Sequence, residues 1–150
     1  MKTLRPYGAR LLVALVLTLT AYNAGASSRS EVSATWTLRV PGFNHLNSVT
    51  YGNGLFVAVR DSPSGSAIYT SRNGRSWTEQ PSPTTKLLRD VAYGNGLFVA
   101  VGSEGTILTS RDGVRWMRRT SPTRDWLSGV AYGNGIFVAV GERGTILTSP

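Results

Sequence analysis

Carboxylate side chains are the first residues to test for hydrolytic chemistry in this chain. Glycoside hydrolysis generally needs two carboxyl groups placed on either side of the scissile bond. The acidic residues are Glu31, Asp61, Glu79, Asp90, Glu104, Asp112, Asp125 and Glu142. No two of them form a distinctive pair by spacing. We therefore assign no catalytic residue, and we expect a binding protein rather than an enzyme.

Metal and nucleophile chemistry have equally little support. His45 is the only histidine and the chain has no cysteine. Zinc sites combine several Cys, His or carboxylate ligands, so we expect no metal site and no cofactor. Three tyrosines, Tyr51, Tyr93 and Tyr132, follow one another in similar surroundings. A nucleophile needs a unique basic partner, so these repeated tyrosines are expected to serve packing.

Cationic side chains offer a different chemistry, the recognition of anions. An arginine matches planar carboxylate or sulfate groups with two parallel hydrogen bonds, and a tryptophan can stack on a sugar. The candidate binding residues are His45, Arg60, Lys86, Arg118, Arg119, Arg124, Trp126 and Arg143. Two alternatives stay open. The cations could form a solvated basic rim, and Trp126 could pack against a neighbouring repeat.

A repeated scaffold must position these residues. Residues 91–110 and 130–149 are identical at all but three positions, and a looser copy starts at Val49. The differences are Leu97/Ile136, Ser103/Glu142 and Glu104/Arg143. Aligning the three tyrosines gives offsets of 42 and 39 residues. Such a period admits helical repeats or propeller blades, but the wealth of Val, Ile, Thr and Tyr and the frequent glycines favour short strands.

Each repeat is predicted to hold four antiparallel strands. Asn-Gly pairs give the tight turn between the first two strands, because both central residues of that turn need positive φ. The second strand, such as 97–101, is apolar throughout, which is typical of a strand buried on both faces. The repeats span about 46–80, 88–120 and 127–149, and the last lacks a fourth strand. A separate fourth strand is predicted at 34–40, where Trp36 corresponds to Trp77 and Trp116.

The predicted meander sorts the loops into two ends. Turns between strands two and three share one end with the crossovers from one repeat to the next. That end holds most residues that depart from the repeat, including the cations named above. Variable loops on a repeated scaffold are where recognition usually occurs, so we expect the binding face there.

Two short segments carry a turn motif with structural chemistry. Their members are Ser71, Asn73, Gly74 and Trp77 in the first repeat and Ser110, Asp112, Gly113 and Trp116 in the second. An Asp or Asn side chain accepts hydrogen bonds from nearby backbone amides, glycine supplies positive φ, and tryptophan fills the space between repeats. We therefore interpret the motif as structural; a metal role for Asp112 is the alternative, although one carboxylate is little for a hard cation.

These segments resemble the Asp-box, also called the bacterial neuraminidase (BNR) repeat. The motif occurs in β-propeller blades of sialidases, photosystem assembly factors and many exported bacterial proteins. The resemblance covers roughly residues 34–150 and implies an all-β propeller of about three blades, partial or completed by oligomerisation. Both segments are one residue shorter than usual before the tryptophan, and Asn73 replaces the acid. Arg39-Val40-Pro41 is faintly similar to an Arg-Ile-Pro element of sialidases, but we interpret it as a turn, because the other repeats also carry prolines after their fourth strands.

The N-terminal segment has the layout of a secretory signal peptide. Basic residues precede an apolar run at 11–21, and Ala24-Gly25-Ala26 is a small-residue cleavage signature. We expect a signal peptide at 1–26, a short linker at 27–33 and a repeat domain at 34–150. An uncleaved anchor is the alternative. The protein is expected to be secreted or periplasmic, with no membrane span after cleavage. Its last residues, 149–150, also fit a shortened form of a longer propeller.

These observations together predict an exported, non-enzymatic module that binds an anionic glycan or a protein through its loop face. A sialidase-like glycoside hydrolase, or a remnant of one, is one alternative. An assembly factor like the photosystem-associated propellers is another. The formal charge of +8 is modest for a nucleic-acid-binding protein, so nucleic acid is not expected as a partner. A second copy that completes the ring is expected as one.

Overall fold

The computed structural model describes residues 35–38, 45–61 and 65–149. The chain divides into a unit of residues 1–36 and a unit of residues 37–150, and every described strand lies in the second unit. The predicted signal peptide (1–26) and linker (27–33) lie outside the described residues. None of the described residues belongs to a helix long and apolar enough to cross a membrane.

The described residues form three antiparallel sheets of four, four and three strands. The first sheet contains β1 (Ser48–Gly52), β2 (Leu55–Arg60), β3 (Ala67–Ser71) and β4 (Thr78–Gln80). The second contains β5 (Leu88–Gly94), β6 (Leu97–Gly102), β7 (Ile107–Ser110) and β8 (Met117–Arg119). The third contains β9 (Leu127–Gly133), β10 (Ile136–Gly141) and β11 (Ile146–Ser149). This confirms the prediction of an all-β fold of antiparallel units, the last one short of a strand.

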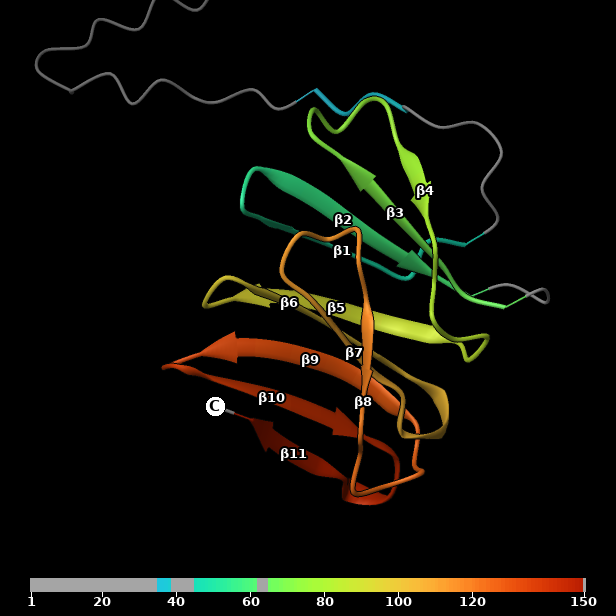
Figure 1. Cartoon of the computed structure of the whole chain (residues 1–150), viewed down its shortest axis with the longest axis vertical. Helices are drawn as coiled ribbons and strands as arrows, with labels where there is room; N and C mark the ends of the chain where they lie inside the picture. The colour runs from blue at the N-terminus through green and yellow to red at the C-terminus, as the bar shows by residue number, and fades with distance from the viewer. Residues whose placement is uncertain (1–34, 39–44, 62–64, 150) are drawn as a thin grey trace, which may run out of the picture. The chain divides into compact units, whose positions relative to one another are not determined.

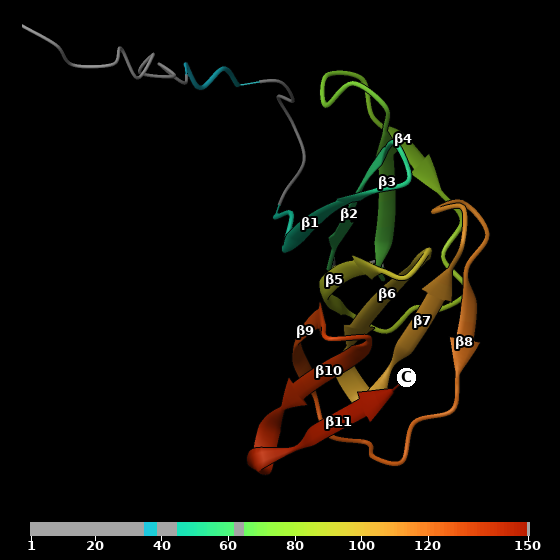
Figure 2. The ribbon, with the colours of Figure 1, turned by 90° about the vertical axis from the view of Figure 1, so that its left-hand side faces the viewer.

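The second sheet lies between the other two (Figures 1 and 2). Strand β5 packs beside β1 on one side and beside β9 on the other. Each sheet is a meander whose first two strands are joined by the predicted Asn-Gly turn. In the second sheet Gly94 pairs with Leu97, and Asn95 and Gly96 have φ of 47° and 73°. Asn and Gly adopt this left-handed backbone more readily than other residues.

Strand β6 is buried on both faces, which explains its unbroken apolar sequence. Phe98 and Ala100 belong to a core cluster shared with the first sheet. Val99 and Val101, which alternate with them and point to the opposite face, belong to a cluster shared with the third sheet. The two cores therefore lie between sheets, and each neighbouring pair of sheets forms one apolar joint.

A tyrosine stacked on a glycine closes each joint. A Cβ atom placed on Gly52 would lie 2.0 Å from Cγ of Tyr93, and one on Gly94 would lie 1.9 Å from Cγ of Tyr132. Real side-chain carbons do not approach so closely, so a residue larger than glycine would push the ring away. The expectation that the repeated tyrosines serve packing fits Tyr93 and Tyr132, whereas Tyr51 is 57% exposed.

The described residues of the predicted front strand at 34–40 form no strand within the single chain. Residues 35–38 are not in a strand, and Trp36 is 95% exposed. A strand requires a neighbour that accepts and donates its backbone hydrogen bonds, and the three sheets consist of β1 to β11 alone within the described residues. The remaining positions of the segment, 34, 39 and 40, lie outside the described residues.

Candidate functional site

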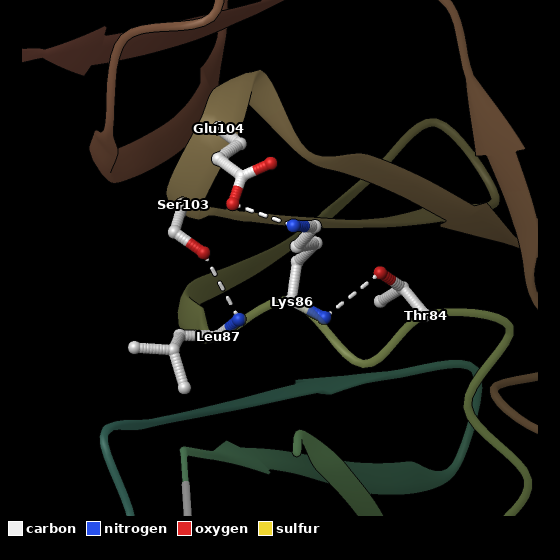
Figure 3. Close-up of polar contacts among 5 residues, drawn as sticks. All are labelled: Thr84, Lys86, Leu87, Ser103 and Glu104. Carbon is white, nitrogen blue, oxygen red and sulfur yellow. Dashed lines mark hydrogen bonds and ion pairs between the residues drawn. The ribbon is translucent and has the colours of Figure 1, made fainter.

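The turns between the second and third strands are bound to the crossovers between sheets. The 3₁₀ turn η1 (Ser103–Gly105) is hydrogen-bonded to the end of the crossover 81–87. Ser103 N–H donates to the carbonyl of Leu87 (2.9 Å), and Leu87 N–H donates to Oγ of Ser103 (3.0 Å). Figure 3 shows the second of these bonds, together with the contact between Lys86 and Glu104. The turn and the crossover thus form one hydrogen-bonded surface at this end of the sheet.

Glycine permits this close contact of backbones. A Cβ on Gly102 would lie 1.8 Å from the carbonyl oxygen of Leu87, and one on Gly141 would lie 2.1 Å from that of Trp126. The third sheet repeats the pattern with η2 (Glu142–Gly144), where Glu142 N–H donates to the Trp126 carbonyl (2.9 Å). The predicted grouping of these turns with the crossovers therefore has a direct hydrogen-bonded basis in the second and third sheets.

A pocket of about 670 Å³ opens on this surface, between η1, the end of β8 and the crossover 120–126. Its lining is polar and basic. The lining residues are Lys86, Glu104, Gly105, Arg118, Arg119, Thr120, Ser121, Thr123 and Arg124. Four of the eight candidate binding residues therefore meet here, drawn from two crossovers and one strand. A shallower hollow beside it shares Lys86 and Arg118.

Two of the four cations in the pocket are already engaged. Nζ of Lys86 lies 2.5 Å from Oε1 of Glu104, and Nε of Arg119 donates to Oγ1 of Thr109 (2.8 Å). The guanidinium groups of Arg118 and Arg124 make no hydrogen bond or ion pair with other described residues. With a single carboxylate against four cations, the pocket carries an excess of positive charge. A guanidinium group with no protein partner can donate two parallel hydrogen bonds to a planar anion such as a carboxylate.

The other candidate residues lie outside this pocket. Arg143 is held by Asp125, with Nη1 2.8 Å from Oδ1. Arg60 lies over the ring of Tyr69, 5.8 Å from its centroid. Trp126 is 36% exposed. The guanidinium of Arg89 lies over its indole, with Cζ 5.3 Å from the ring centroid. His45 is exposed, with φ of 56°. The packing alternative for Trp126 gains support from Arg89, since a stacked cation covers one face of the indole.

Asp125 anchors η2 to the crossover 120–126. Its Oδ2 accepts the hydroxyl of Thr145 (2.9 Å), and its Oδ1 accepts Nη1 of Arg143 (2.8 Å). The Thr145 hydrogen bond, followed by that from Thr123 and the charge of Arg143, lowers the pKa of Asp125. Hydrogen bonds to the charged form have this effect. The hydrogen bond from Thr145 therefore ties η2 to the crossover, and the ion pair with the exposed Arg143 adds little to it but gives that guanidinium a partner that Arg118 and Arg124 lack.

The two turn motifs lie at the opposite end of the sheets. Oδ1 of Asp112 accepts the amides of Arg115 (2.8 Å) and Val114 (2.9 Å), and these bonds lower the pKa of its carboxyl. Ser110 Oγ accepts the Gly113 amide (2.8 Å). Asn73 and Ser71 make the corresponding bonds in the first sheet, to the amides of Arg75, Ser76 and Gly74. Backbone capping accounts for the acid or amide at this position.

The tryptophan of the second motif packs between sheets. Trp116 is 7% exposed, lies in the cluster between the first and second sheets, and donates its Nε1–H to the Gly113 carbonyl (2.9 Å). A large aromatic ring whose polar edge is satisfied stabilises such a joint strongly. In the first sheet Trp77 packs against the cluster of Ala58, Ala67 and Tyr69.

Sequence reasoning missed the neutral part of the pocket. Ser121 and Thr123 line it, and both also shape the crossover through bonds to backbone amides. The Ser-x-Thr pattern that recurs at 82–84 and 121–123 was the available signal, since such hydroxyls typically organise turns. No group of three His, Cys, Asp or Glu side chains with metal-binding geometry occurs among the described residues.

Comparison with known proteins leaves the geometry as the basis for any functional proposal. Neither the protein-family models nor the curated proteins give a match to this chain.

Proposed function

We propose that this chain is an exported, non-enzymatic β-propeller module that binds an anionic group of a glycan or protein. The observation that carries the proposal is the convergence of Lys86, Arg118, Arg119 and Arg124 on one pocket at the loop end. Two guanidinium groups there have no partner among the described residues. Carboxylate or sulfate groups are the ligands that two such forks bind best.

The propeller part of the proposal rests on the repeated joints. The first strands β1, β5 and β9 lie side by side, and Tyr93 and Tyr132 sit on the preceding sheet in the same way. An array that repeats one joint adds each sheet with a similar rotation. We infer that the three sheets are blades of a partial ring, with the pocket on one of its loop faces. Export follows from the predicted leader.

Binding of defined anions tests this function directly. The probes are a sulfated disaccharide, a uronic-acid oligosaccharide and a neutral oligosaccharide of equal length, each titrated by calorimetry. We expect the two anionic probes to bind and the neutral one not to, with affinity falling as salt rises. Loss of one charge-assisted hydrogen bond typically weakens binding tenfold or more, so Arg118→Ala and Arg124→Ala should each reach about that loss.

Arg111→Ala is the matched control. Arg111 is an exposed arginine at the opposite end of the second sheet, so its removal changes net charge equally without touching the pocket. If Arg111→Ala and Arg118→Ala weaken oligosaccharide binding equally, the effect comes from net charge alone, and this result would refute a specific site. The same protein is assayed for glycoside turnover, where hydrolysis lost in Arg118→Ala would replace the binding function with an enzymatic one.

A further inference from the structure

An apolar slot lies between the second and third sheets, with a volume of about 580 Å³. It occupies the position that Trp116 fills between the first and second sheets. Gly113 and Trp116 enter the first joint beside Leu55 and Val57. The residues equivalent to Leu55 and Val57 in the second sheet are Leu97 and Val99, and both line the slot. The slot is therefore the second joint without its tryptophan.

The walls of the filled joint and of the slot are the same. On one side Val57, Val59 and Ile68 correspond to Val99, Val101 and Ile107. On the other side Val91, Phe98 and Leu108 correspond to Val130, Phe137 and Leu147. All six pairs are identical in residue type. A cavity whose lining matches a site already filled by an indole is shaped for another indole, because packed interiors leave little room for misfit.

Trp36 is the matching side chain. It is 95% exposed, and Trp36-Thr37 repeats the sequence of Trp77-Thr78. It precedes Leu46 by ten residues, whereas Trp77 precedes Leu88 and Trp116 precedes Leu127 by eleven. Leu88 and Leu127 start the first strand of their sheets, and Leu46 lies two residues before β1. Trp77 and Trp116 each belong to the fourth-strand segment of one sheet and precede the first strand of the next sheet. Trp36 precedes the first sheet at nearly the same spacing, as the fourth strand of a preceding sheet would.

The outer faces of the first and third sheets supply a matching tyrosine and glycine, while Tyr69, at the position of Leu108 in the filled joint, is already buried on the first sheet with Ala58 and Ala67. Tyr51 is 57% exposed, while its equivalents Tyr93 and Tyr132 cover Gly52 and Gly94. A Cβ on Gly133 would meet nothing within 4 Å. The exposed side chains beside these positions are Val49 on the first sheet and Val140 and Ile146 on the third. One face offers the tyrosine of a joint and the other offers the glycine.

We propose that a second copy of this chain docks its first sheet on the open face of the third sheet. Tyr51 of the second copy then covers Gly133, and its residues 35–38 pair with β11, so that Trp36 enters the slot. A head-to-tail contact of this kind closes into a ring when its rotation permits, and two copies give six sheets. The inference uses the propeller arrangement proposed above and is independent of anion binding.

Sedimentation of the protein, purified after export from cells that express the full chain, tests the joint. We expect a mass of at least two chains. Trp36→Ala and Gly133→Ala should each weaken association by roughly 30-fold or more, as loss of a central interface anchor does. Neither change touches a packed residue of the single chain. Thr37→Ala is the control, since in a strand this neighbour points to the opposite face, and it should associate as the parent does.

Fluorescence quenching by iodide separates the possible occupants of the slot. The signal of Trp36, taken as the difference between parent and Trp36→Ala, should be shielded in the associated protein and accessible after dilution. A single-copy protein with shielded Trp36 would mean that the chain fills its own slot and would overturn the proposal. So would a single copy with accessible Trp36, or a dimer that survives both Trp36→Ala and Gly133→Ala. Failure of the anion site would appear separately, as lost oligosaccharide binding with unchanged mass.

Discussion

Replacement of Gly94 by alanine tests whether the stacking of tyrosine on glycine holds neighbouring sheets together. The new Cβ would lie 1.9, 2.2 and 2.4 Å from Cγ, Cδ1 and Cδ2 of Tyr132. Ordinary carbon contacts are about 3.5–4.0 Å, so the ring must retreat by on the order of 1.5 Å. Its neighbour Phe137, whose ring centroid is 4.8 Å from that of Tyr132, must then move as well.

The expected destabilisation is therefore at the upper end of the overpacking range, about 3 kcal/mol. For a domain of this size it corresponds to a fall of roughly 10–15 °C in Tm. Neither Gly94 nor Gly133 has a positive φ, so alanine meets no backbone strain at either position. Urea unfolding followed by tryptophan fluorescence measures the free energy of unfolding, and a calorimetric scan gives Tm.

Gly133 is the internal control for this measurement. It follows the same Ala-Tyr dipeptide as Gly94, but a Cβ there meets no atom within 4 Å. Gly133→Ala in dilute protein should change the free energy of unfolding by less than about 0.5 kcal/mol. Equal effects of the two substitutions would refute the reasoning, because the sequence contexts match and only the tyrosine contact differs.

Three other predictions concern the turn motif and the rim of the pocket. Trp116→Ala should destabilise the protein by about 4 kcal/mol, because it empties the first joint of a buried indole; a fall of less than about 1 kcal/mol in urea unfolding would contradict the assigned packing. Asp112→Asn should reduce the loss of stability on acidification: the folded pKa of Asp112 is lowered, so its stabilisation is present above the ordinary pKa of about 4 and is lost as pH falls through the folded value. Unfolding curves at pH 6 and pH 3 check this, and an unchanged difference between them would count against it. A double-mutant cycle on Lys86 and Glu104 should give a coupling of less than 1 kcal/mol, since both side chains are well exposed; a coupling above about 2 kcal/mol would show that the pair organises the crossover.

Local signals in the sequence predicted the strands well. Asn-Gly pairs located the hairpin between the first two strands of each sheet, and the unbroken apolar run at 97–101 correctly indicated a strand buried on both faces. The shape of the turns between the second and third strands was not predictable in the same way. Glu104 and Arg143 adopt φ of 52° and 54°, which neither residue type favours. The flanking glycines and the hydrogen bonds to the crossovers impose it.

The front strand at 34–40 stays a prediction, because a strand depends on its neighbour and residues 35–38 have none within the single chain. Residues 34–40 have the right composition, but composition cannot supply a hydrogen-bonding edge.

The pocket was predictable in part for a related reason. Periodicity places Lys86, Arg118, Arg119 and Arg124 at the loop end. Their distances, and the capture of Arg143 by Asp125, depend on how two crossovers fold over one turn, which is a property of the assembled sheets.

The likeness of the joints makes the second and third repeats interchangeable. Both present the same Val, Phe and Leu toward the sheet in front of them, so either fits behind a sheet that presents Val, Val and Ile, whereas the first sheet has Tyr69 at the leucine position. A duplication of one repeat would extend the array without a new interface having to arise. The length of such a chain can therefore change in steps of about 40 residues, and each added repeat brings another loop end on which side chains are free to diversify.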